Sequence, residues 1–315
     1  MNTLAVVLEQ PEQLALRHFV LPAAGPGDVV VDVDWTGISA GTERLLWTGR
    51  MPAFPGMGYP LVPGYETCGR IIAAGEASGH TVGEHVFLAG ARCYGETRAL
   101  FGGAASRIVV DGSRATAVRP GLGADATLFA LTATAYHAAW GSGGAAPELI
   151  IGHGALGRLL ARLACALAPD APPPVVWETN PRRRGGARGY QVLDPAEDPR
   201  RDYRTICDMS GATGIVDDLV ARLAPGGEIV LAGFYAEPVA FAFPPAFQRE
   251  ARLRVAAEWR PADLAAVAQL VNAGTLDLGG LVSHQVPAAS AAAAYRTAFE
   301  DTDCIKMTLD WRDAG

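Results

Sequence analysis

The sequence lacks the features of disulfide-rich, membrane-spanning and nucleic-acid-binding proteins. Its five cysteines are odd in number, lie far apart and include no Cys-x-x-Cys pair, which argues against a disulfide framework and a zinc ribbon. No window approaches the roughly 20 apolar residues that cross a bilayer, and the N-terminus lacks a signal-peptide core. A formal charge of −7 argues against nucleic acid as a partner. We therefore expect a cytoplasmic protein, with peripheral membrane contact still open.

What the chain does contain is typical of a globular enzyme. Half of its 315 residues are hydrophobic, which is enough for two domains with substantial cores. Its 37 glycines and 22 prolines exceed the average without forming low-complexity tracts, so the composition indicates a loop-rich fold rather than disorder.

The pattern of apolar residues divides the chain into two kinds of structure. Up to about residue 120 it predicts short strands and turns, with Val29, Val31 and Val33 on one face of a strand. Residues 45–65 are rich in proline and glycine and predict a long functional loop without a regular element. From residue 123 onward, strands and helices alternate, which predicts a parallel sheet with helices on both faces. The expected fold is α/β, with a mostly-β domain (1–122 and 260–315) and a doubly wound domain (123–259).

A glycine-rich turn in the second domain predicts a dinucleotide site. The stretch LIIGHGALGRLL places the turn between a short apolar strand and a leucine-rich helix, which is the context that makes the Gly-x-Gly-x-x-Gly pattern specific. Gly152 permits a tight turn, Gly154 lets the backbone approach a pyrophosphate, and Gly157 lets the helix pack closely on the strand. The helix N-terminus offers free N–H groups to the phosphates.

Residues beyond the turn bear on which dinucleotide is bound. Glu178 lies where an acidic residue, about 20 positions on, binds the adenosine ribose and repels a 2′-phosphate, which predicts NAD. Arg182, Arg183 and Arg184 leave open the alternative that the chain binds NADP. His153 and Ser210 have structural alternatives, as a spacer and as a helix cap. The predicted cofactor-binding residues are Gly152, His153, Gly154, Ala155, Leu156, Gly157, Glu178, Thr179, Asn180, Arg182, Ser210 and Gly233.

The chain as a whole resembles the medium-chain dehydrogenase/reductase superfamily. The similar stretches are GISAGTE (37–43), PGYETCGRI (63–71), TAYHA (134–138), APGGEIVLAGF (224–234) and KMTLDW (306–311). The resemblance implies a GroES-like catalytic domain and a Rossmann-type cofactor domain. Long loop stretches, among them GRMPAFPGMGYPLVPGYE and FGGAASR, resemble the branch that acts on bacteriochlorophyllides. That resemblance implies oxidation of a 3-(1-hydroxyethyl) side chain to 3-acetyl with NAD, in bacteriochlorophyll synthesis.

The chain departs from the zinc-dependent members of this superfamily at the metal positions. The cysteine position reads Ser39 or Ala40, the histidine position reads Tyr65, and no cysteine lies near residues 134–138. Only Cys93 remains where the resemblance implies four structural cysteines. Hydroxyl and methyl side chains are not usual zinc donors, so we predict an enzyme without zinc.

The resemblance also supplies the candidate catalytic residues. Thr42 matches a hydroxyl that contacts the substrate oxygen, with a turn cap as the alternative. Tyr65 could exchange a proton if its pKa were lowered, or could form an aromatic wall. Glu43 and Glu66 match acidic positions and are expected to orient their neighbours.

A tetrapyrrole is flat and mostly apolar, and it needs a wide hydrophobic site. Aromatic and methionine side chains provide such a surface, although core packing would also explain them. The predicted substrate-binding residues are Trp47, Met51, Phe54, Met57, Tyr59, Phe101 and Trp140. The superfamily implies a dimer or a tetramer, and of these we expect a homodimer.

Two other functions remain open at this point. One is a zinc-independent quinone or enone reductase of the same superfamily, which would use NADPH. The other is a dinucleotide-binding protein without catalysis, which would have intact glycines and no competent base.

Overall fold

The computed structural model describes residues 1–141, 143–235 and 237–314, which form two compact units. Unit 1 consists of Met1–Ala130 and the segment from Leu278 onward, and unit 2 is Leu131–Asp277. Residues 123–130 thus belong to unit 1 and residues 260–277 to unit 2. Among the described residues, no helix combines the length and the apolar character needed to cross a membrane.

Unit 1 is mostly β structure. Its strands are β1 (Asn2–Gln10), β2 (Gln13–Val20), β3 (Asp28–Ile38), β4 (Leu61–Pro63), β5 (Thr67–Ala74), β6 (His85–Leu88), β7 (Arg98–Leu100), β8 (Arg107–Asp111), β9 (Ala115–Ala117), β16 (His284–Pro287) and β17 (Met307–Asp310). They form a four-stranded sheet in the order β2-β1-β4-β7. A seven-stranded sheet has the order β16-β17-β3-β5-β6-β9, with β8 also paired to β3.

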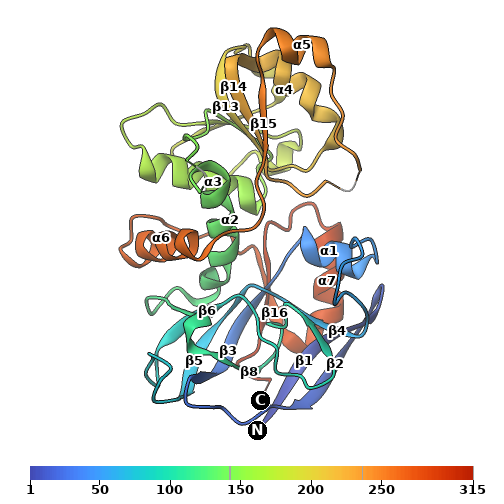
Figure 1. Cartoon of the computed structure of the whole chain (residues 1–315), viewed down its shortest axis with the longest axis vertical. Coiled ribbons are helices and arrows are strands. Elements are labelled where there is room, and N and C mark those ends of the chain that lie inside the picture. The colour runs from blue at the N-terminus through green and yellow to red at the C-terminus, as the bar shows by residue number, and fades with distance from the viewer. Residues whose placement is uncertain (142, 236, 315) are drawn as a thin grey trace. The chain divides into compact units, whose positions relative to one another are not determined.

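Strand β3 is the centre of this unit. It pairs antiparallel with β17, β5 and β8. The predicted alternation is incomplete, because Val30 is buried together with Val29 and Val31, and the pairing with β5 is irregular between Val30 and Val31. The pairing of β3 with β17 brings the C-terminal strand back to the first hundred residues. Helix α7 (Ala291–Glu300) lies beside β16 and β17 (Figure 1). Residues far apart in the sequence therefore share one hydrophobic core.

The prediction of one long loop over residues 45–65 is wrong at both of its ends. Helix α1 (Thr42–Trp47) extends into its start, and strand β4 occupies its end. Leu45, Leu46 and Trp47 precede the first breaker, Gly49, so the helix meets no obstacle. Strand β4 forms because it pairs with β1 on one side and β7 on the other, which is a long-range effect.

Unit 2 contains a parallel sheet with the strand order β12-β11-β10-β13-β14-β15. Its strands are β10 (Leu149–Ile151), β11 (Val175–Trp177), β12 (Gln191–Leu193), β13 (Tyr203–Asp208), β14 (Leu223–Leu231) and β15 (Arg252–Val255). In sequence order this is the 3-2-1-4-5-6 arrangement of the Rossmann fold. The predicted doubly wound sheet is therefore confirmed, and its topological switch point lies between β10 and β13.

Helices surround this sheet. They are α2 (Phe129–Ala139), which begins just before the start of unit 2, α3 (Ala155–Leu167), α4 (Val216–Arg222), α5 (Phe243–Gln248) and α6 (Pro261–Asn272). Helices α4 and α5 lie beside each other near β14 (Figure 1). Helix α6 belongs to unit 2, and it contacts α2 through His137 Nδ1 and Asp263 Oδ2, which lie 2.8 Å apart with both side chains nearly buried.

Candidate functional site

The glycine turn lies at the carboxyl end of β10, where open α/β sheets bind their ligands. Gly152 has φ +94°, so it adopts the left-handed conformation that glycine tolerates. A Cβ on Gly157 would lie 1.9 Å from the carbonyl oxygen of Gly152, whereas one on Gly154 would meet no atom within 4 Å. The structure thus needs glycine at 157 for packing, and it leaves space at 154, at the N-terminus of α3.

Two backbone N–H groups hold the carboxylate of Glu178 at the end of β11. Its Oε2 accepts from the N–H of His153 at 3.0 Å, and its Oε1 accepts from that of Asn180 at 2.8 Å. Glu178 is half-buried, so lone pairs remain for a ligand. The predicted acidic residue therefore lies directly against the glycine turn. Thr179 beside it is exposed, and Asn180 caps the following turn by accepting from the N–H of Arg182 at 3.0 Å.

The side chain of His153 lies in the protein interior. It is fully buried, and its Nδ1 and Nε2 lie 2.6 Å from the Arg183 carbonyl oxygen and 2.9 Å from the Tyr190 hydroxyl. Burial lowers the pKa of His153 to about 4, so the ring is neutral at physiological pH. The ring therefore contacts protein groups, and its backbone N–H belongs to the Glu178 contact. That His153 binds the cofactor stays a prediction, and both ring nitrogens already contact protein groups.

Ser210 and Gly233 close the switch point on the side of β13 and β14. Ser210 N–H and Oγ bond to Asp208 Oδ1 at 2.8 and 2.6 Å, and a Cβ on Gly152 would contact Ser210 at 3.5 Å. A Cβ on Gly233 would lie 2.4 Å from the Gly211 backbone nitrogen.

The Tyr235 hydroxyl donates to Asp208 Oδ2 at 2.7 Å, a contact that no local sequence pattern predicts. Ala155 and Leu156 form the first turn of α3.

In unit 1, three hydroxyl groups meet at the positions singled out in the sequence. Ser39 Oγ and Tyr65 Oη lie 2.7 Å apart, and the Thr42 side chain also hydrogen-bonds to Tyr65. Burial, followed by the charge of Glu66, raises the pKa of Tyr65 above its usual range. The phenol therefore keeps its proton and is able to donate a hydrogen bond, which differs from the lowered pKa considered from the sequence. Ser39 joins the group as a residue that sequence reasoning treated only as a substituted metal position.

Glu43 lies behind these hydroxyls and is almost fully buried. It accepts from the Ser39 N–H at 3.2 Å and from the hydroxyl of Tyr295 in α7. Burial raises its pKa to about 7. A hydroxyl can reverse from donor to acceptor, so protonated Glu43 can keep both partners by donating to Tyr295. This surrounding accommodates both protonation states of the carboxyl group.

Glu66 forms a buried ion pair with Lys306, the single lysine of the chain. Lys306 Nζ also donates to the Ile38 carbonyl oxygen at 3.1 Å. A Cβ on Gly37 would lie 2.1 Å from Glu66 Oε2, so a glycine at 37 makes room for the pair. Burial raises the pKa of Glu66, and the charge of Lys306 opposes that shift. Glu66 thus joins β3, β5 and β17 and lies near Glu43.

The donor set in unit 1 does not fit a zinc ion. Ser39 and Tyr65 present hydroxyls that bond to each other, and neither is a usual zinc ligand. Within residues 1–141, 143–235 and 237–314, no group of three or more His, Cys, Asp or Glu side chains is placed to hold a metal. The polar side chains that meet at these positions carry hydroxyl and carboxyl groups.

The predicted substrate residues fall into three groups. Trp47 lies in the core of unit 1 and packs on Tyr295 and Phe299, with centroid distances of 6.0 and 6.4 Å. Phe101 packs edge-to-face on Tyr65 at 5.1 Å, so it is the aromatic ring next to the hydroxyl cluster. The others are spread along the chain: Met51, Met57 and Tyr59 pack partly against the core of unit 1, Phe54 is 41% exposed, and Trp140 packs on Tyr136 in unit 2.

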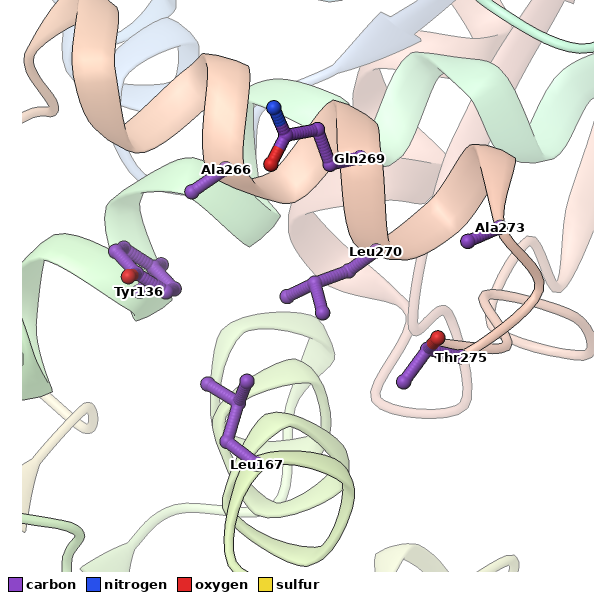
Figure 2. A pocket seen from close by; sticks show the side chains of 7 residues that line it. All are labelled: Tyr136, Leu167, Ala266, Gln269, Leu270, Ala273 and Thr275. Atoms are coloured by element: carbon purple, nitrogen blue, oxygen red, sulfur yellow. The ribbon is translucent and has the colours of Figure 1, made fainter.

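Unit 2 also has a cavity of about 380 Å³ away from the glycine turn (Figure 2). It is lined by Tyr136, Leu167, Ala266, Gln269, Leu270, Ala273 and Thr275. Leu270 and Leu167 point toward each other across it (Figure 2). Leu167 is the last residue of α3, whereas the turn precedes its first, so about 18 Å of helix lies between them. The lining has no charged group and offers no catalytic chemistry.

Comparisons with known proteins identify the family. Residues 25–139 match the alcohol dehydrogenase GroES-like domain. The 2-desacetyl-2-hydroxyethyl bacteriochlorophyllide A dehydrogenase of Rhodobacter capsulatus is 56% identical over 315 residues, covering 100% of both chains. The protein of that name from Cereibacter sphaeroides is 54% identical and covers 99% of both. The chain is therefore a medium-chain dehydrogenase/reductase. Within that superfamily, it belongs to the family of the 2-desacetyl-2-hydroxyethyl bacteriochlorophyllide A dehydrogenases.

Solved structures share the fold of the whole chain. A short chain alcohol dehydrogenase from Escherichia coli, complexed with NADH, covers 98% of this chain and 99% of its own, with a TM-score of 0.81 at 20% identity. The L-idonate 5-dehydrogenase of Escherichia coli covers 98% of both chains, with a TM-score of 0.84 at 18% identity. These similarities confirm the predicted combination of a GroES-like domain and a Rossmann domain.

Proposed function

We propose that this chain oxidises the hydroxyethyl side chain of a bacteriochlorophyllide to an acetyl group, with NAD as hydride acceptor and without zinc. The observation that carries the proposal is 56% identity over all of both chains to the Rhodobacter capsulatus dehydrogenase. It favours this function over a quinone or enone reductase and over a protein that only binds a dinucleotide. We further propose that the enzyme acts in the cytoplasm as a homodimer.

Unit 2 supplies the groups that would hold the dinucleotide. The open space over Gly154 admits a diphosphate close to the backbone, and the first turn of α3 offers N–H groups and a partial positive charge. Glu178 would accept from the ribose hydroxyls and repel a 2′-phosphate, which supports NAD over NADP. When bound, NAD supplies the carbon that accepts the hydride.

Unit 1 supplies the groups for the alcohol. Oxidation removes a hydride from the carbon and a proton from the oxygen, and the C–O bond becomes a carbonyl. Thr42 and Tyr65 provide hydroxyls that can bind the reacting oxygen, and the raised pKa of Tyr65 keeps it a donor as charge develops. Ser39 lies beside both groups, because its hydroxyl contacts Tyr65 and its backbone N–H donates to Glu43. The N–H passes on no proton, so the released proton would reach Glu43 through water. Glu43, with a pKa of about 7, is the group suited to hold the released proton.

The pigment needs an apolar surface near those hydroxyls. Phe101 lies against Tyr65, and the exposed or half-buried Met51, Phe54, Met57 and Tyr59 come from the segment between α1 and β4. We propose that these side chains contact the macrocycle, whereas Trp47 supports them from the core. Trp140 of unit 2 remains a separate candidate.

The test is a spectroscopic assay with both nucleotides. The purified protein is mixed with hydroxyethyl bacteriochlorophyllide and either NAD or NADP, and the absorption of the macrocycle is followed together with that of the reduced nicotinamide. A shift from conjugation of the new acetyl group, at the rate of NADH formation, is expected with NAD. If the absorption of the macrocycle does not shift with either nucleotide, the proposal is wrong. Metal analysis of the active protein tests the absence of zinc separately.

A further inference from the structure

The buried ring of His153 joins the glycine turn to the loop that follows β11. Its Nδ1 lies 2.6 Å from the Arg183 carbonyl oxygen, and a carbonyl oxygen only accepts hydrogen bonds. Nδ1 therefore carries the proton. Because burial keeps the ring neutral, Nε2 is an acceptor, and the Tyr190 hydroxyl donates to it at 2.9 Å. The tautomer and the orientation of His153 are thus fixed by two contacts from the same connection between strands.

Arg158 of α3 also links the glycine turn to the loop that follows β11. Its Nε donates to the His153 carbonyl oxygen at 2.9 Å, and its NH2 nitrogen donates to the Arg183 carbonyl oxygen at 2.8 Å. The side chain is nearly buried, and a Cβ on Gly186 would lie 2.6 Å from the NH1 nitrogen of Arg158. One guanidinium thus binds the glycine turn and the arginine loop, residues 181–184, at the same time.

The arginine loop has a second anchor at its end. Arg184 Nε donates to the Glu178 carbonyl oxygen at 2.8 Å, and the guanidinium also contacts Thr179 and Asp194. The loop is therefore bound at the backbone of Arg183 and at the side chain of Arg184. The loop therefore lies beside Glu178, the acidic residue expected to bind the adenosine ribose.

We propose that His153 and Arg158 are positioning residues that hold the arginine loop against the glycine turn, and that the loop held in this way makes the protein select the nucleotide with a free 2′-hydroxyl. This inference rests on the proposed use of NAD. It assigns the selectivity to buried contacts behind Glu178 as well as to Glu178 itself. When these contacts are removed, the loop can move, and its arginines can approach a 2′-phosphate.

The test measures dissociation constants for NADH and NADPH by fluorescence titration of the whole chain without pigment. His153→Phe keeps the bulk of the ring and removes both nitrogens, and Arg158→Met removes both bonds from the guanidinium. Each variant is expected to weaken NADH binding roughly tenfold, the equivalent of one or two net hydrogen bonds, and to leave NADPH binding unchanged or tighter. The ratio of the two constants therefore falls.

Arg162→Met is the matched control. Arg162 lies one turn further along α3, is buried to the same degree, and donates to the Asp277 carbonyl oxygen at 3.0 Å. It should leave the ratio unchanged. Thermal melting shows whether His153→Phe folds. If it does not, Tyr190→Phe replaces it in the test, because that variant removes only the hydroxyl that contacts His153 Nε2. If the His153 and Arg158 variants keep the wild-type ratio of the NADPH and NADH dissociation constants, this inference is wrong and the proposed function is unaffected. Tighter binding of NADPH than of NADH by the wild type would overturn the choice of NAD and this inference with it.

Discussion

Replacing Glu43 with glutamine should remove a pH-dependent part of the stability. Its pKa rises from 4.5 in the unfolded chain to about 7 in the folded one. Between these values the folded state holds a proton that the unfolded state has released. The free energy of unfolding therefore decreases as pH rises through this window. At about 1.4 kcal/mol per pKa unit, the decrease is about 3 kcal/mol, and the full value applies because the group is buried.

Urea unfolding across this pH range measures the effect. The unfolding free energy of the wild type minus that of Glu43→Gln should fall from acid to neutral pH and then stay constant. Glu84 is the control because His80 and Thr81 lower its pKa, so the corresponding difference for Glu84→Gln should rise with pH. A Glu43 difference that is flat, or that rises with pH, would refute the argument.

The same substitution also tests the proposed role of Glu43 in the reaction. The carboxylate form is required to take up a proton, so kcat/KM of the wild type should rise with pH and level off above about 7. Glu43→Gln should lower kcat by about 10² or more and lose this inflection. A variant with the wild-type profile would show that Glu43 has no part in proton uptake.

Four further substitutions test the two units. Gly154→Val should abolish NADH binding in a fluorescence titration while melting like the wild type, because the space at 154 is open in the protein itself. Gly157→Ala should lower the melting temperature, with a cost of about 1–3 kcal/mol, because its Cβ meets the Gly152 carbonyl oxygen. Lys306→Met should destabilise by about 3–5 kcal/mol in urea by leaving the buried Glu66 unpaired, and adding Glu66→Gln should recover most of that loss. Thr42→Val should reduce turnover more than nucleotide affinity in steady-state kinetics, and unchanged turnover would exclude Thr42 from the chemistry.

The local pattern of apolar residues and glycines was sufficient to predict most of the strands and helices of unit 2. Strands such as β10 and helices such as α3 alternate with clear periodicity, and the turn between them depends on glycines whose roles are set by neighbours a few residues away. Helix α5 was not predicted, and its sequence contains Pro244 and Pro245. Both prolines lie in the first turn, where the missing N–H has no helical partner to lose.

Long-range contacts account for what the sequence did not reveal. Nothing near Trp47 indicates that it packs on Tyr295 and Phe299, about 250 positions later in the chain. The inward direction of the His153 ring depends on Arg183 and Tyr190 in the same way. The family resemblance supplied the candidate catalytic positions, whereas their hydrogen-bond partners required coordinates.

The burial of Lys306 has a chemical consequence. Because the chain has one lysine and that lysine is enclosed, the folded β-rich unit shields this side-chain amine from reagents in solution. A reagent that acylates amines would reach position 306 only when the strands around it separate. The extent of labelling there, followed by mass spectrometry, would therefore report how often the β-rich unit opens.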